Sequence, residues 1–295
     1  MSDFTDPLKA LYLEWGGRFA ADPEMPLNVM RDMQEAWHTV AVEAPGVSYE
    51  TVDVDGIPAI WAIPAEADPA RAMLFTHGGG FAAGSPASHR KLAGHIANAF
   101  GGRVLVIDYR RVPEAFYPAQ TEDAVTAYRW LTAQGHAPEK IVTAGDSAGG
   151  TIALATVVSL RDQGLPQPGA VFAMSPGLDW EGLWMDNEDT DALASKALVV
   201  GMGANAFAGR DPKDPLCNPV YADLRGFPPV YISAGGAENL VGAARRFTEV
   251  ATEAGVDVRL DVAPDRQHAH TFAAGNDPEA DRTIAEFGEW VSARL

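Results

Sequence analysis

One short segment carries the pattern of a nucleophilic serine. Residues 145–149 read G-D-S-A-G and stand between a run typical of a β-strand and a run typical of a helix, which is the context that the pattern G-x-S-x-G requires. Small residues suit this place because the chain turns so sharply that larger side chains would collide there. The pattern therefore predicts Ser147 as a nucleophile whose hydroxyl projects at the edge of a sheet.

A glycine-rich segment forms the second pattern. Residues 77–80 read H-G-G-G and follow the apolar run 72–76. Glycines let the backbone curl until the N–H groups of Gly79 and Gly80 point at one spot, where the oxyanion of a tetrahedral intermediate can sit. The N–H of Ala148 would add a third donor. A glycine triplet alone indicates only a flexible loop, but next to a strand-turn-helix serine it predicts an oxyanion hole.

A serine hydroxyl needs a histidine base, and that base needs a carboxylate to orient it. With a serine of this pattern the acid and then the base follow along the chain. The histidines downstream of Ser147 are His268 and His270, so we expect at least one of them to act as the base. Two histidines so close could also bind a metal, but no second cluster of ligands is apparent and no metal site is expected.

Strands that alternate with helices must position these residues. From residue 72 onward the alternation is typical of βαβ units and a parallel sheet. Residues 47–54 and 57–63 alternate polar and apolar side chains around Asp55-Gly56, which predicts an antiparallel hairpin at the sheet edge. The expected fold class is therefore α/β, a doubly wound and mostly parallel sheet. Its strands are expected at 72–76, 103–108, 140–144, 170–175, 230–234 and 256–262, and its helices at 88–100, 119–134, 148–162, 240–254 and 278–295.

The length of 295 residues suits a single domain over residues 1–295. Residues 1–45 and 178–215 do not follow the alternation, and we expect them to form a helical cap over the strand ends, where α/β sheets bind ligands. Residues 201–206 formally fit a dinucleotide-binding loop, but they lie in this cap, so no cofactor is expected. The cap segments also hold four tryptophans that could line an apolar pocket or pack in a core: Trp15, Trp37, Trp180 and Trp184.

The composition excludes several classes of partner. Lys and Arg total 22 against 40 Asp and Glu, a net charge of -18 at pH 7, and such a surface repels nucleic acids and anionic lipids. The single cysteine, Cys217, suggests a reducing compartment. Residues 1–7 lack the features of a signal peptide, and no apolar stretch is long enough to span a bilayer. We therefore expect a cytoplasmic protein that binds neither nucleic acid nor membrane.

From about residue 45 to the C-terminus the sequence resembles the hormone-sensitive-lipase-like family of bacterial α/β-hydrolase esterases. The family's motifs appear here as H-G-G-G-F at 77–81, Y-R-R-V-P-E at 109–114, G-D-S-A-G-G at 145–150, S-P with Asp179 at 175–179, and G-F-P-P at 226–229. The resemblance implies the α/β-hydrolase fold, hydrolysis of short-acyl esters without a cofactor, and the ability to form a homodimer.

The resemblance also implies the acid and the base. Where the family commonly reads D-P-L, this chain reads Glu238-Asn239-Leu240, so the acid would be Glu238, with Asp265 as the next carboxylate to test. When Pro264 is aligned with the proline before the family's histidine, the base falls on His268 rather than His270.

These residues together predict a serine carboxylesterase. His268 would take the proton of Ser147 as its hydroxyl attacks a small ester, and an acyl-enzyme would form and then be hydrolysed. A lactone hydrolase is the main alternative, because it would use the same residues on a cyclic ester and some similar proteins are described in this way. An amidase or peptidase is not favoured by any residue, and a non-catalytic receptor on this scaffold would be expected to lack part of the triad.

Overall fold

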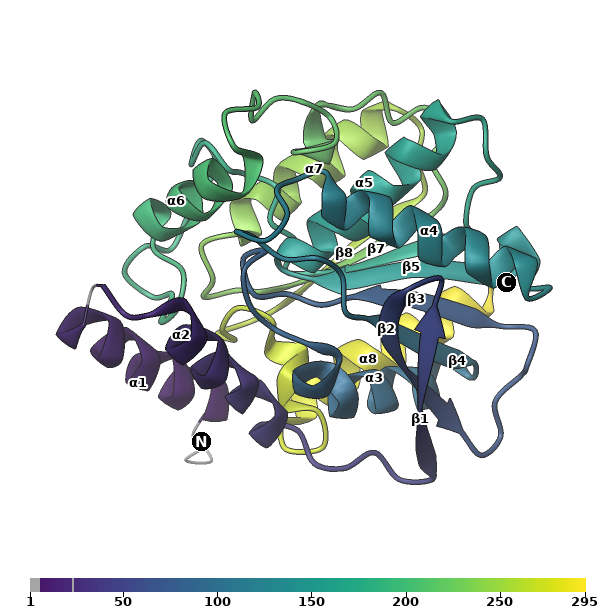
Figure 1. The fold of residues 1–295 in the computed structure, drawn as a ribbon, viewed down its shortest axis with the longest axis horizontal. Helices are drawn as coiled ribbons and strands as arrows, with labels where there is room; N and C mark the ends of the chain where they lie inside the picture. Colours follow the sequence, from purple (N-terminus) through teal and green to yellow (C-terminus); the bar gives the residue numbers. More distant parts are fainter. Residues whose placement is uncertain (1–5, 23) are drawn as a thin grey trace.

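A computed structural model of the chain describes residues 6–22 and 24–295 (Figure 1). Residues 1–5, on which part of the signal-peptide prediction rests, lie outside the described residues. The fold is built on an eight-stranded sheet of order β1-β2-β4-β3-β5-β6-β7-β8. Its strands are β1 Val47–Val54, β2 Ile57–Pro64, β3 Ala72–Thr76, β4 Arg103–Ile107, β5 Ile141–Asp146, β6 Ala170–Met174, β7 Val230–Gly235 and β8 Val258–Ala263.

The sheet is parallel except at one edge. β1 pairs antiparallel with β2, and β2 pairs antiparallel with β4, as the predicted hairpin requires. Every residue of β3, β5, β6 and β7 is buried, which explains why their sequences are continuous apolar runs rather than alternating ones. The edge strand β1 is buried only in part, and its sequence alternates.

Helices cover both faces of the sheet (Figure 1). Helices α3 and α8 pack on one face, and α4, α5 and α7 pack on the other. Each predicted strand and helix between residues 72 and 295 has its counterpart here, with ends that differ by a few residues. The helices of the two layers are α3 Pro86–Phe100, α4 Ala119–Ala133, α5 Ala148–Asp162, α7 Val241–Glu253 and α8 Pro278–Ser292.

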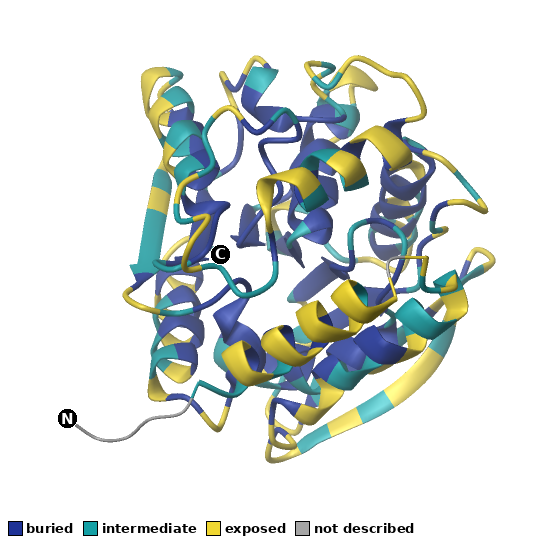
Figure 2. Cartoon of the chain, turned by 90° about the vertical axis from the view of Figure 1, so that its left-hand side faces the viewer, coloured by how far each residue is buried: buried dark blue, intermediate teal, exposed yellow. Residues whose placement is uncertain are grey.

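Three further helices gather at one end of the sheet. They are α1 (Pro7–Ala21), α2 (Leu27–Gln34) and α6 (Lys196–Phe207), and they belong to the two segments that the sequence sets apart as a cap. Figure 2, which views this end directly, shows their outer faces exposed and their inner faces buried. The glycines at 201 and 203 lie inside α6, so the pattern 201–206 is helix interior and not a phosphate-binding loop.

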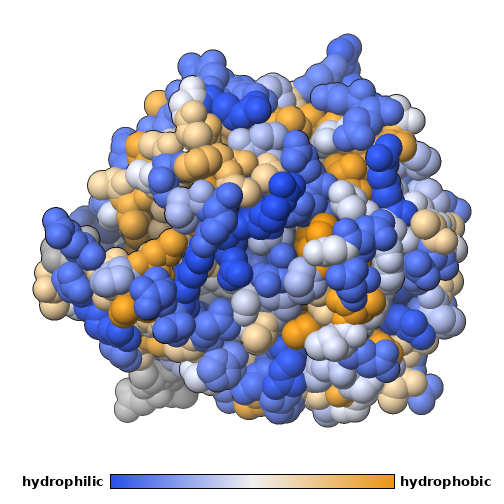
Figure 3. All heavy atoms as spheres, in the orientation of Figure 1, coloured by the Kyte–Doolittle hydropathy of each residue, from blue (hydrophilic) through white to orange (hydrophobic). Residues whose placement is uncertain are grey.

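In Figure 3 hydrophilic residues dominate the visible face, and smaller apolar patches lie in the region of α6 and toward the centre of the view. Among residues 6–22 and 24–295, no helix is both long and apolar enough to cross a membrane.

Candidate active site

Ser147 occupies the turn between β5 and α5. Its backbone has φ 54° and ψ -122°, a conformation that costs a non-glycine residue about 1–3 kcal/mol and that persists only where the surroundings enforce it. A Cβ atom on Gly145 or Gly149 would overlap the carbonyl oxygen of Thr76. Glycine is therefore required on both sides of the serine because β3 passes too close to this turn for any side chain.

Backbone hydrogen bonds fix this turn to the next strand of the sheet. The N–H of Ser147 donates to the carbonyl of Met174 at 2.9 Å, and the N–H of Gly177 donates to the carbonyl of Ser147 at 3.0 Å. The strained serine is thus held on both sides by the chain at the end of β6.

The loop after β3 presents its amides to the same place. Gly79 and Gly80 have φ values of 109° and 61°, a region that residues with side chains avoid. Within the described part of the chain, neither amide N–H has a hydrogen-bond acceptor. The N–H of Ala148 is also free of an intrahelical partner, since it opens helix α5. Gly79, Gly80 and Ser147 line one pocket, and Ala148 is fully buried next to the serine.

Two buried side chains, those of Asp146 and His89, hold this glycine loop from behind. The N–H of Gly78 donates to Oδ1 of Asp146 at 3.0 Å, and Nε2 of His89 lies 3.1 Å from the same oxygen. Asp146 immediately precedes Ser147, so the glycine loop and the serine turn are fastened to each other through one carboxylate.

His268 faces Glu238 across the end of the sheet. Nδ1 of His268 lies 3.6 Å from Oε2 of Glu238, an ion-pair distance rather than a hydrogen bond. The two side chains are 3% and 0% exposed. Burial on its own would lower the pKa of His268, but the neighbouring Glu238 carboxylate, with Asp191 and Asp146 farther away, outweighs burial and raises that pKa.

The Glu238 carboxylate is fixed by only one of its oxygens. Oε2 accepts hydrogen bonds from the Ser175 hydroxyl at 2.6 Å and from the N–H of Gly235 at 3.1 Å. Oε1 of Glu238 and Nδ1 of His268 are both buried and have no hydrogen-bond partner among the described residues. The Glu238 carboxylate and the His268 ring are therefore available to hydrogen-bond to each other. Hydrogen bonds between catalytic groups are often long without substrate and shorten when substrate binds.

The N-terminal helix supports the loop that carries His268. The Tyr12 hydroxyl of α1 donates to the carbonyl oxygen of His268 at 3.0 Å, and Nε1 of Trp37 donates to the Tyr12 oxygen at 3.2 Å. Trp37 also stacks on Phe272, with ring centroids 5.4 Å apart. The N-terminal arm thus contributes to the position of the histidine as well as to the pocket wall.

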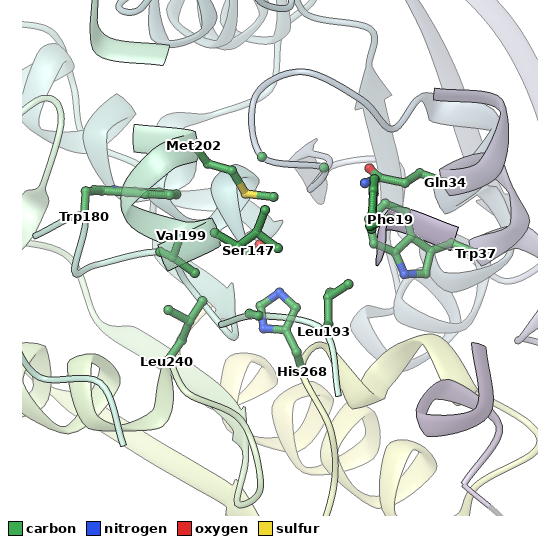
Figure 4. A pocket seen from close by; sticks show the side chains of 14 residues that line it. Phe19, Gln34, Trp37, Ser147, Trp180, Leu193, Val199, Met202, Leu240 and His268 are labelled. Atoms are coloured by element: carbon green, nitrogen blue, oxygen red, sulfur yellow. The ribbon is translucent and has the colours of Figure 1, made fainter. Parts of the chain in front are cut away.

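The pocket around Ser147 is narrow and mostly apolar. Its cavity volume is ≈ 40 Å³. Figure 4 shows Trp180 at one end, Phe19, Gln34 and Trp37 at the other, and the imidazole of His268 pointing toward Ser147 between them.

Comparisons with known proteins agree with this geometry. A family model described as an alpha/beta hydrolase fold matches residues 73–272. An acetyl-hydrolase of Streptomyces hygroscopicus is 38% identical over 292 residues, covering 92% of this chain and 97% of that protein. The esterase LipU of Mycobacterium tuberculosis is 33% identical over 261 residues, covering 85% of each.

Solved structures point to the same family. An esterase from the bacterial hormone-sensitive lipase family is 37% identical, with a TM-score of 0.92 over 98% of this chain and 97% of that one. A hormone-sensitive lipase from a metagenome library is 33% identical, with a TM-score of 0.90 over 99% of both. The chain belongs to the hormone-sensitive-lipase-like family of α/β-hydrolase esterases. This esterase is thus a carboxylic ester hydrolase, and the family and fold predicted from its sequence are confirmed.

The two alternatives left by the sequence, His270 as the base and Asp265 as the acid, are not among the residues that line the pocket of the esterase. His270 points to α8, where its Nε2 lies 3.0 Å from the Thr283 hydroxyl, and burial lowers the pKa of His270 to about 4. Asp265 is exposed. Of the four cap tryptophans, Trp37 and Trp180 line the pocket, Trp15 packs in the core and Trp184 packs on Tyr221.

Sequence reasoning missed several residues that position the esterase's site. Asp146 stands inside the serine motif and Ser175 inside the S-P motif, so the motifs signal the two positions but not their partners. His89 and Tyr12 carry no pattern that identifies them, because their contacts depend on the tertiary fold.

Proposed function

We propose that this esterase hydrolyses small, short-acyl carboxylic esters through an acyl-enzyme on Ser147. The observation that carries the proposal is the convergence on one pocket of a serine in a strained turn, the Gly79 and Gly80 amides, and a buried histidine beside a buried glutamate. Backbone strain and buried charge both lower the stability of a fold. Features of this kind are therefore more typical of a functional site than of a structural core.

In the proposed first step His268 removes the hydroxyl proton of Ser147 as Oγ attacks the ester carbonyl carbon. Nδ1 of His268 faces Glu238, so Nε2 is the nitrogen that takes the proton. The Glu238 carboxylate stabilises the imidazolium that forms. The negative charge that develops on the carbonyl oxygen is stabilised by the N–H groups of Gly79, Gly80 and Ala148.

In the second half of the reaction the protonated His268 gives its proton to the leaving alcohol, and the acyl group stays on Ser147. A water molecule that loses a proton to His268 then attacks the acyl carbon. As the bond between the acyl carbon and Oγ breaks, His268 returns the proton to Oγ of Ser147 and the acid is released. The pocket volume of ≈ 40 Å³ supports a short acyl group. The name acetyl-hydrolase given to a 38% identical relative agrees with this choice.

The test compares the wild type with Ser147→Ala on p-nitrophenyl acetate, after titration of each protein with a fluorophosphonate probe. The wild type is expected to turn over and to be labelled once per chain, and the variant to lose both properties while its circular dichroism is unchanged. Retention of more than a few per cent of the activity by Ser147→Ala would refute the proposal. Hydrolysis of lactones by the same residues stays a prediction, and adding γ-butyrolactone to the assay tests it.

A further inference from the structure

We propose that Trp180 sets the longest acyl chain that this esterase accepts, by closing the catalytic pocket against a second cavity on its far side. This inference rests on the proposed function, since it assumes an acyl group on Ser147. It identifies the residue that restricts the acyl group and the space that a longer chain would fill.

Two cavities meet at the Trp180 indole. One is the pocket of ≈ 40 Å³ that contains Ser147 and His268. The other, with a volume of ≈ 330 Å³, is lined by residues of α6 and the chain after it. Among the described residues that line them, Trp180 is the one that the two cavities share.

The fold holds the indole firmly in this position. Trp180 is 5% exposed, and its ring packs on Phe81 and Phe207 at centroid distances of 5.2 and 5.7 Å. Glycine flanks the ring on two sides. A Cβ atom on Gly203 would lie 2.9 Å from that of Trp180, and one on Gly177 would overlap the ring itself. Two glycines thus make room for this side chain, so it acts as a fixed wall.

The catalytic pocket is open on another side, which reaches Gln34 at the end away from Trp180 (Figure 4). It continues into a cavity of ≈ 400 Å³ between α2 and α6, whose rim includes the exposed residues Ala197, Gly201 and Asn205 of α6. The catalytic pocket and this cavity share Gln34, Gly79, Gly80, Leu198 and Met202.

The two ends therefore suit the two parts of an ester. The alcohol must leave and water must enter while the acyl group is still bonded to Ser147, and both steps need a route to solvent. The open end provides that route, so the acyl group is assigned to the end that Trp180 closes. A chain too long for this end would have to displace a buried, packed indole.

The far cavity offers apolar surface to such a chain. Its lining includes Val200, Gly203, Ala204 and Phe207, with Glu181 and Arg210 as its charged members. Each methylene group buried there would contribute about fourfold to kcat/KM if the transition state holds it as well as an apolar solvent does. Removal of the indole should therefore change selectivity rather than only widen the pocket.

The experiment measures kcat/KM for p-nitrophenyl esters from acetate to decanoate with the wild type, Trp180→Leu and Trp180→Ala. Trp184→Leu is the matched control, because Trp184 belongs to the same segment but lines neither cavity. We expect both Trp180 variants to raise the octanoate-to-acetate ratio at least about tenfold, the effect of a few buried methylenes. Trp184→Leu should keep the wild-type ratio.

A second series, acetate esters of alcohols from ethanol to decanol, tests which end Trp180 closes. A change confined to this alcohol series would overturn the assignment to the acyl group. Unchanged ratios in folded, fluorophosphonate-labelled Trp180→Leu would overturn the inference, as would a wild type that already hydrolyses decanoate as well as acetate. If Trp180→Ala does not fold, the smaller change to Leu provides the same readout. A wild type without any ester hydrolysis would instead refute the proposed function.

Discussion

The Ser175 hydroxyl donates a hydrogen bond of 2.6 Å to Oε2 of Glu238. The same hydroxyl oxygen accepts the N–H of Ala269 at 2.9 Å, and Ala269 directly follows His268. Ser175 is itself held at φ 44°, in a region that few residues with side chains adopt. One buried hydroxyl therefore connects the loop of the proposed acid to the loop of the proposed base.

Replacement of Ser175 by alanine is expected to lower kcat by about tenfold to a hundredfold, the range of one hydrogen bond to a charged group. KM should change little, because Ser175 does not line the pocket. Steady-state kinetics on p-nitrophenyl acetate measure both constants. Ser233→Ala is the control, since that buried hydroxyl on β7 has no hydrogen-bond partner among the described residues. Equal losses in both variants would mean that Ser175 contributes only packing.

The Ser175 connection marks the boundary of what the sequence can predict. The strands could be predicted because burial on both faces makes each a continuous apolar run, and the serine turn because its glycines are neighbours in the chain. Ser175 and Glu238 are 63 residues apart, and Tyr12 and His268 are 256 apart. No local pattern encodes such pairs, because only the packing of the whole sheet and its N-terminal arm brings them together.

The pH dependence of kcat/KM should report the environment of His268. The base must be neutral to accept a proton, so activity is present above the pKa of His268 and is lost as the pH falls through it. Because Glu238 raises that pKa, we expect the acidic limb of the profile above 6.5, the usual value for histidine. A limb at lower pH would mean that burial of the ring, not the carboxylate, dominates.

Glu238→Gln removes the charge but keeps the shape of the side chain. We expect kcat to fall at least about a hundredfold, because the imidazolium loses its counter-charge, and the acidic limb to move to lower pH for the same reason. Asp265→Asn is the matched control, since Asp265 is exposed and its loss should leave both the limb and kcat unchanged. A near-normal kcat in Glu238→Gln would transfer the role of the acid to another carboxylate.

Alanine substitutions at the two histidines should have different consequences. His268→Ala removes the proposed base, so kcat should fall by several orders of magnitude. His270→Ala removes a buried ring that is hydrogen-bonded to Thr283, so it should cost about 1–3 kcal/mol of stability while most of the activity remains. Thermal unfolding and ester kinetics on both proteins give the comparison. An inactive but stable His270→Ala variant would reverse the assignment.

The last glycine of the serine motif, Gly149, gives the most stringent test of the turn. Gly149 opens α5 against β3, where a Cβ atom would overlap the carbonyl oxygens of Thr76 and His77. These are backbone atoms that cannot rotate away, so Gly149→Ala must push α5 from β3 and separate the Ser147 turn from the glycine loop at residues 78–80. We expect a loss of stability together with a large fall in kcat.

Gly17 provides the contrast. It lies in helix α1, and a Cβ atom placed on it would have no atom within 4 Å, so Gly17→Ala should stabilise the protein by about 0.5–1 kcal/mol. Chemical denaturation of both variants measures the change in the free energy of unfolding, which should fall for Gly149→Ala and rise for Gly17→Ala. A Gly149→Ala variant as stable and as active as the wild type would show that the close approach of β3 and α5 is not required.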